Sequence, residues 1–103
     1  MRRRYPYDGT CRDCLRKRQV YRAWRSGGGN YRRGGRNYAS SICEECTLGR
    51  LGRATPGSSA GRWDTHSLED IVASLGTTEA AEVLTAWRDR KDHRRWLREA
   101  RRA

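Results

Sequence analysis

Four cysteines in two closely spaced pairs set the first limit on the fold of this chain. The pairs are Cys11-Arg-Asp-Cys14 and Cys43-Glu-Glu-Cys46, and residues 15–42 separate them. Two residues between thiols let both sulfurs of a pair turn toward one point, so two such pairs can surround a metal ion with four thiolates. The separation is longer than the roughly 15–20 residues common in such sites, but its glycine-rich middle suits a hairpin or a long loop. The spacing therefore predicts a structural Zn²⁺ site with all four cysteines as ligands.

The composition explains why the chain needs such a cross-link. It has 103 residues, of which 35% are hydrophobic and 34% charged, with no Phe and a single Met. A chain this short and polar buries too little apolar surface for a stable core of its own. Because metal binding adds to the free energy of folding, four thiolates around Zn²⁺ would supply what the core lacks.

Other uses of the four cysteines stay open at this point. Disulfides would require an oxidising compartment, of which the sequence has no sign. A redox CxxC pair is expected within a βαβ pattern that is absent here, and an iron–sulfur cluster takes the same ligands. A catalytic zinc site usually keeps one open position and often uses His or Glu. The two histidines, His66 and His93, lie outside the cysteine segment, so we expect a closed structural site.

The pattern around the cysteine pairs predicts a small α+β, metal-stapled domain. Gln19 to Arg25 and Asn37 to Ile42 have the character of two strands, with Val20 and Trp24 on one face of the first strand. The glycines between these segments predict the turn of a hairpin. A short helix is expected after the second cysteine pair, so residues 1–53 are interpreted as a four-cysteine finger with a basic N-terminal arm.

The second part of the chain predicts a helical hairpin. Residues 54–66 are rich in Gly, Ser, Ala and Thr, which is typical of a linker. In residues 67–103, Ser67 can cap a first helix, Gly76 can end it, and one of the two threonines that follow can cap a second helix. The apolar residues at helical spacing are Leu68, Ile71, Val72, Leu75, Ala80, Val83, Leu84 and Trp87.

At the cysteine pairs the chain resembles a finger of the treble-clef or zinc-ribbon type. A treble clef has a CxxC knuckle, a hairpin and a second CxxC that opens a helix, and Ile42-Cys43-Glu44-Glu45-Cys46 with Leu48 and Leu51 looks like its second half. The resemblance covers about residues 5–53 and implies the metal, whereas such fingers bind DNA, RNA or protein. Some treble-clef families are nucleases of the HNH type, but the histidines that they need are absent from this segment. The whole chain also resembles small Arg-rich finger proteins of actinobacteria and their phages.

Ile71 to Gly76 resembles the first half of a helix-turn-helix as well. The apolar position expected six residues after Gly76 is Glu82, and residues 77–82 hold two Glu and no basic side chain. A recognition helix that faces phosphates should not be acidic. DNA reading by this motif therefore stays an alternative that the second half does not support.

The net charge of +11 predicts a polyanionic partner. The basic excess lies in residues 1–36 and 83–103, whereas residues 64–82 are acidic. Basic groups neutralise phosphates and aromatic faces stack on unpaired bases, so we expect the finger to contact DNA or RNA. The candidate contacts are Arg12, Arg16, Lys17, Arg18, Arg22, Trp24, Arg25, Tyr31, Arg32, Arg33 and Arg36. A second basic surface is expected at Arg94, Arg95 and Arg98.

Together these patterns predict a zinc-finger nucleic-acid-binding protein, regulatory in its plainest setting of transcription, and not an enzyme. The sequence has no phosphate-binding loop, no paired carboxylates in an apolar setting and no deaminase pattern. One alternative is an adaptor that binds a larger machine, such as RNA polymerase or the ribosome, in part through the helical hairpin. The other is a structural component that neutralises nucleic acid in a ribonucleoprotein or virion. With no membrane-length apolar run and no export signal after Met1, we expect a cytoplasmic protein.

Overall fold

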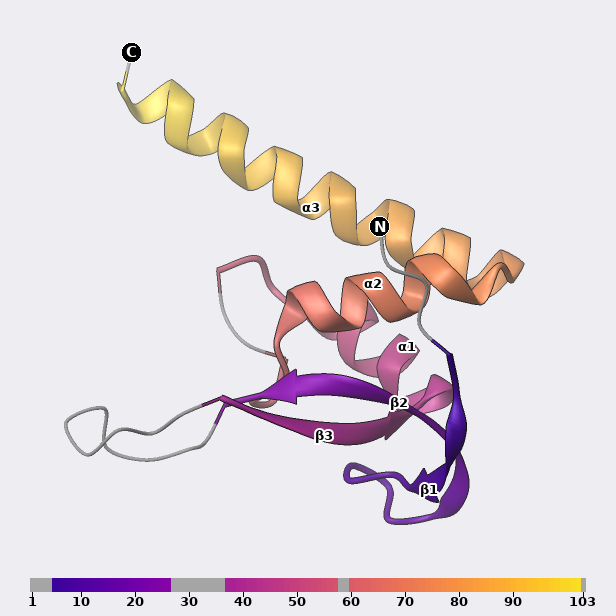
Figure 1. Ribbon diagram of the computed structural model, residues 1–103. Helices are drawn as coiled ribbons and strands as arrows, with labels where there is room; N and C mark the ends of the chain where they lie inside the picture. Colours follow the sequence, from indigo (N-terminus) through magenta and orange to yellow (C-terminus); the bar gives the residue numbers. More distant parts are fainter. Residues whose placement is uncertain (1–4, 27–36, 58–59, 103) are drawn as a thin grey trace, which may run out of the picture.

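A three-stranded antiparallel sheet carries helices on one face, and the last helix packs across the first two (Figure 1). The computed structural model describes residues 5–26, 37–57 and 60–102. In these residues the strands, in the order β1-β2-β3, are β1 (Tyr7–Thr10), β2 (Lys17–Arg25) and β3 (Tyr38–Cys43). The helices are α1 (Glu44–Arg53), α2 (Thr65–Leu75) and α3 (Thr78–Arg102). The small α+β architecture expected from the sequence is confirmed.

Strands β2 and β3 form the predicted hairpin. Arg25 lies opposite Tyr38 and Val20 lies opposite Cys43, so β3 ends at the second cysteine pair. Val20 and Trp24 share a face, because side chains alternate along a strand. Only Val20 is buried there, whereas Trp24 is 48% exposed. Ala23, on the other face of β2, belongs to the core.

Strand β1 is a feature that the sequence does not predict. It pairs with the first half of β2, with Tyr7 opposite Val20 and Thr10 opposite Lys17. The tight turn between the two strands is the first cysteine knuckle, closed by the backbone bond from Cys11 N to Arg16 O at 2.9 Å. The second half of β2 has no β1 residue beside it, which leaves that edge of β2 open to another segment.

The segment that fills this edge lies within the predicted linker, residues 54–66. Trp63 forms an antiparallel bridge with Arg25, and the Asp64 N–H donates to Trp24 O at 2.9 Å. Trp63 is fully buried, and Ala54 and Ala60 are also core residues. The two predicted units share one hydrophobic core, although their division stays a prediction from the sequence.

The helical hairpin begins earlier than predicted, because the cap of α2 is Asp64 and not Ser67. The Asp64 carboxylate accepts from the Ser67 N–H at 3.2 Å and from Ser67 Oγ at 3.1 Å. Ser67 is buried, and its Oγ accepts from the Trp24 N–H at 3.2 Å. The sheet edge thus holds Asp64 in the extended conformation that starts the helix. Gly76 ends α2 in the left-handed conformation as expected, and Thr77 Oγ1 caps α3 by accepting from the Ala80 N–H at 3.1 Å.

The apolar faces of the hairpin meet each other and α1. Leu68, Ile71 and Val72 of α2 are buried, as is Trp87 of α3, whereas the predicted residues Leu75, Val83 and Leu84 are half-buried at the margin of the core. None of the helices in the described ranges is long and apolar enough to cross a membrane.

Candidate metal centre and its basic surroundings

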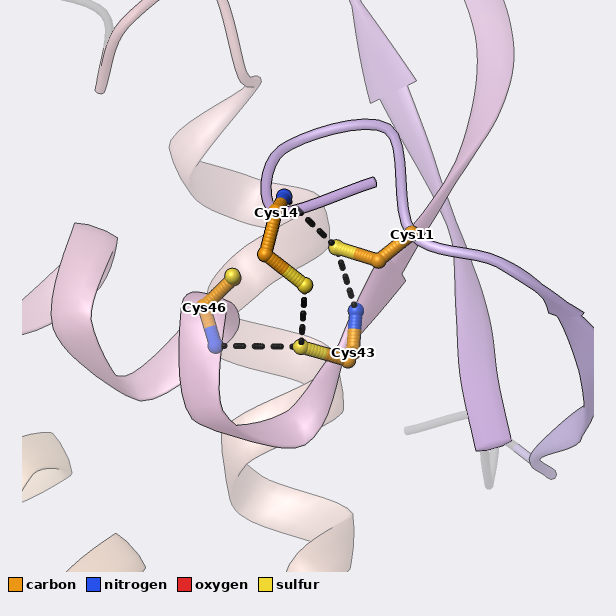
Figure 2. A group of neighbouring side chains, drawn as sticks. All are labelled: Cys11, Cys14, Cys43 and Cys46. Atoms are coloured by element: carbon orange, nitrogen blue, oxygen red, sulfur yellow. Dashed lines mark hydrogen bonds between the residues drawn. The ribbon is translucent and has the colours of Figure 1, made fainter. Parts of the chain in front are cut away.

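The four cysteines come together from three separate parts of the fold (Figure 2). Cys11 and Cys14 lie in the turn between β1 and β2, Cys43 is the last residue of β3, and Cys46 lies in the first turn of α1. Cys43 is also the N-cap of α1, and its sulfur accepts from the Cys46 N–H at 3.4 Å. The hairpin and the start of α1 therefore position the second pair, and the knuckle positions the first.

The distances between the sulfurs fit a metal ion. All four Sγ atoms lie within 4.8 Å of one another, and Cys14 Sγ is 3.9 Å from Cys43 Sγ. A tetrahedral ion with metal–sulfur distances of about 2.3 Å requires its sulfurs to be roughly 3.8 Å apart. A disulfide would require about 2.05 Å, and all four cysteines are free thiols. The cluster is thus positioned to chelate a metal ion.

Backbone N–H groups beside two of the sulfurs favour the ionised, thiolate form of these cysteines. Cys11 Sγ accepts from the N–H groups of Cys14 and Cys43, both at 3.4 Å, and Cys43 Sγ lies at the N-terminus of α1, where the helix dipole favours an anion. Such bonds to the ionised form stabilise a thiolate. They lie in the buried part of the cluster, since Cys11 and Cys43 are both fully buried.

The surroundings shift the pKa values of the thiols in this cluster in opposite directions. A hydrogen bond from the backbone of Arg16 is the main cause that lowers the pKa of Cys14 to about 7. Burial raises the pKa of Cys43, and burial together with the neighbouring thiols raises the pKa of Cys46. Four crowded thiols therefore resist full ionisation by themselves, whereas a bound cation deprotonates the thiols that coordinate it.

Two arginines beside the cluster offset the charge that a filled site would carry. Four thiolates around a divalent cation leave a net charge of about −2. Arg18 of β2 donates to Glu45 at 3.3 Å, and contacts with Cys14 and Cys43 raise its pKa. The hydrogen bond and charge of Asp13 raise the pKa of Arg50 on α1, and the charge of the nearby Cys46 adds to this. Cationic side chains thus flank the cluster from both the strand and the helix.

An ion pair that was not predicted from the sequence joins the two halves of the centre. Arg50 Nε donates to Asp13 Oδ2 at 2.9 Å and Arg50 Nη2 donates to Oδ1 at 2.6 Å. This paired hydrogen bond connects α1 to the knuckle and lowers the pKa of the Asp13 carboxyl. A signal for it exists, because Arg50 is four residues after Cys46 and so shares its helix face, and Asp13 lies inside the first CxxC. Gly61, with a positive φ of 60°, lets its turn approach the same guanidinium group.

The predicted nucleic-acid contacts divide into several environments. Arg12, Arg16, Lys17 and Arg22 are exposed, whereas Arg18 lies at the cysteine cluster. Arg25 turns to the other face of β2, where it lies 5.0 Å from the centroid of Trp63 and donates to Tyr38 Oη at 3.1 Å. The remaining predicted contacts, which lie outside the described residues, are Tyr31, Arg32, Arg33 and Arg36.

One face of the sheet, which also carries the buried Val20, collects three of the larger exposed side chains. Alternation places Tyr7, Arg22 and Trp24 on this face. The cross-strand neighbour of Trp24 is Ala39, and that of Arg22 is Ser41, which also hydrogen-bonds to Tyr7 Oη. Because the neighbours on β3 are small, they leave the indole of Trp24 half exposed.

The second predicted basic surface lies on the far half of α3. Arg94, Arg95 and Arg98 are exposed and line a groove between α3 and the Pro56–Gly57 turn. Arg94 donates to Pro56 O. Arg88 and Lys91 line the same groove, although the sequence analysis does not select them.

No protein-family model, curated protein or solved structure significantly matches this chain. The geometry of the described residues therefore carries the functional argument alone.

Proposed function

We propose that this chain is a zinc-stapled nucleic-acid-binding protein whose open sheet face contacts nucleic acid. The observation that carries the proposal is the half-exposed Trp24 on that face, beside Arg22 and across from the small Ala39. A protein with so little apolar surface would gain by burying this indole. Its exposure supports a contact with another molecule, and an aromatic face beside a guanidinium group suits a stacked base next to a phosphate.

Zinc is the metal that we propose for the cysteine cluster. Four thiolates close a tetrahedral shell, which is the usual arrangement of a structural zinc site, and leave no open position for catalysis. The order knuckle, hairpin, and helix with the second pair at its N-terminus supports a treble clef rather than a zinc ribbon. In this proposal the metal fixes the knuckle and β3, and thereby stiffens the sheet that presents Trp24.

An adaptor role through the helical hairpin has less support. Most of the apolar docking face is covered within the chain, because Leu68 and Ile71 are 0% exposed and Trp87 is 2% exposed, and only Leu84 of this set is half-buried. Exposed apolar groups on α3 lie further along, at Trp96 and Leu97. We therefore propose the sheet face as the binding surface and nucleic acid as its partner.

The test compares two exposed tryptophans. Trp24→Ala should weaken binding to a labelled single-stranded DNA or RNA by roughly 5- to 150-fold, which corresponds to about 1–3 kcal/mol for one stacked base. Trp96→Ala, at a residue 60% exposed on the far half of α3, serves as the matched control and should change affinity little. Equal affinities of the two variants, or no binding by the wild-type protein, would refute the proposed sheet contact.

The metal is tested on the same preparation. The purified protein should contain one equivalent of zinc by elemental analysis, and a variant with Cys43→Ser and Cys46→Ser should contain none. Stoichiometric iron in place of zinc, with the absorption of an iron–sulfur cluster, would refute the assignment of the metal. Zinc retained by the double variant would refute the assignment of the ligands.

A further inference from the structure

A groove along α3 has many basic side chains on one side and the turn at Pro56 and Gly57 on the other. Five basic side chains of the helix line it, and the Pro56–Gly57 turn forms its other side, enclosing about 540 Å³. Gly57 has a φ of 90°, a conformation that favours glycine, and the guanidinium group of Arg94 lies against this residue. The five basic residues are Arg88, Lys91, Arg94, Arg95 and Arg98.

The carboxylates around this groove neutralise only part of its charge. Glu69 of α2 is shared by Arg88 at 3.4 Å and Lys91 at 3.0 Å. Asp92 pairs with Arg95 at 2.9 Å. Two carboxylates thus serve five cations, and Arg98 has no ion pair within the part of the chain that the structure describes. The groove retains a positive surplus that an anionic ligand can satisfy.

The far half of α3 separates its basic and apolar side chains. At 100° per residue, the five groove residues and the two terminal arginines, Arg101 and Arg102, fall within an arc of roughly 140°. His93, Trp96, Leu97 and Ala100 fall on the opposite side of the helix. This half of α3 extends away from the sheet and the other helices (Figure 1), and residues 92–102 are exposed. One continuous basic row is therefore accessible along several turns of a helix.

We propose that this groove binds the phosphodiester backbone of nucleic acid, as a second site separate from the sheet face. Arginine forks bind phosphate oxygens with paired hydrogen bonds and stay charged at any physiological pH. The row is open and runs along the helix, so it suits a polymer of phosphates better than one small anion. Because its contacts go to phosphates, the site binds without preference for base sequence.

The test removes two charges from the groove in a background without the sheet contact. In Trp24→Ala protein, Arg95→Gln with Arg98→Gln should weaken binding to labelled duplex DNA and duplex RNA of equal length. For DNA, the slope of log K against log salt should fall by about 1.8, since each lost phosphate contact contributes about 0.9. The matched control carries Arg53→Gln with Arg62→Gln, which removes the same charge at two exposed positions outside the basic row and the sheet face, and should bind more tightly than the groove variant.

Each other outcome has a defined meaning. Equal losses in the groove and control variants would show an effect of net charge and overturn the proposal. If Trp24→Ala abolishes binding completely, the groove proposal is refuted and the proposed sheet contact stands. If Trp24→Ala binds as tightly as wild type and only the groove variant loses affinity, the proposed sheet contact is refuted and the groove proposal stands. Binding to vesicles with anionic lipids that Trp96→Ala abolishes, without binding to either duplex, would show that the helix serves a membrane surface and would also overturn the proposal.

Discussion

Removing the zinc that we propose for the cysteine cluster should unfold the helical hairpin together with residues 5–53. Cys11 and Cys43 are fully buried members of the same hydrophobic core that contains Trp63 and Trp87. Trp63 connects the two parts directly, because it pairs with Arg25 of β2 and stands immediately before Asp64, the cap of α2. Without the cross-link between the knuckle and β3, the buried cysteines no longer pack against the core that they share with α2 and α3.

The magnitude supports complete unfolding. Structural zinc contributes about 10–16 kcal/mol at pH 7 in small fingers, whereas whole domains of ordinary size are stable by about 5–15 kcal/mol. Because the proposed metal contribution is as large as the stability of a whole domain, we expect the metal-free chain to be unfolded. An isolated 25-residue α3 would retain only fractional helicity in water.

Hydrogen exchange and fluorescence can measure this coupling. A zinc chelator should remove amide protection from the 11-residue α2 and from the first half of α3 as well as from the sheet. In a Trp24→Phe, Trp96→Phe background the emission comes only from the buried Trp63 and Trp87, and it should shift to the red and recover when zinc returns. Protection of α2 and α3 that persists after chelation, with unshifted emission, would refute a shared core and support two independent units.

Three further changes test separate contacts. Arg50→Gln leaves the mostly buried Asp13 without its paired donor and should cost about 1–2 kcal/mol in chemical unfolding of the zinc-bound protein, less than a buried charged bond because the Arg50 side chain is 34% exposed; an unchanged midpoint would contradict the clamp. Leu51→Ala at a fully buried position of α1 should cost about 2–5 kcal/mol by the same assay, and a loss below 1 kcal/mol would contradict the packing. Burial raises the pKa of Glu69, but the hydrogen bonds around the carboxylate, that of Lys91 first, together with the charge of Lys91 lower it more, so the net pKa lies below the ordinary 4.5. The stability that Glu69 adds is present above the unfolded pKa and disappears as the pH falls through the folded one, so the difference between wild type and Glu69→Gln should vanish in that range; a difference independent of pH would contradict the ion pair.

The local elements could be predicted because short-range patterns specify them. The CxxC spacing indicates the cysteine cluster, strand periodicity indicates β2 and β3, and Gly76 with Thr77 marks the boundary between α2 and α3. These signals depend on a few neighbouring residues, and the structure confirms each element that they predict. The same holds for α1, whose acidic first turn and inward Leu48 and Leu51 follow directly from its sequence.

The features that could not be predicted depend on contacts between distant segments. Strand β1 is only four residues long and becomes a strand because β2 offers it an edge. Asp64 outcompetes Ser67 as the cap of α2 because its N–H is held by Trp24 O, which no local pattern reveals. A tryptophan at the end of a linker-like segment is expected to pack on something, as Trp63 does, but its place beside the open edge of β2 depends on the bridge to Arg25.

Charge composition alone overstates the surface that this chain offers to nucleic acid. Arg18 offsets the cysteine cluster, Arg25 covers Trp63, Arg50 holds Asp13, and Arg90 donates to the carbonyl of Leu51 at the end of α1 at 2.9 Å. Each of these arginines has a structural partner, and replacing it would disturb the fold before it revealed a ligand. Substitutions report on ligand binding best where a charged or aromatic side chain is exposed on a sheet face or in a groove and does not hold the fold together. In the described residues these positions lie on the sheet face of Trp24 and in the groove of α3, so variants there are informative when they are compared with variants elsewhere at equal net charge.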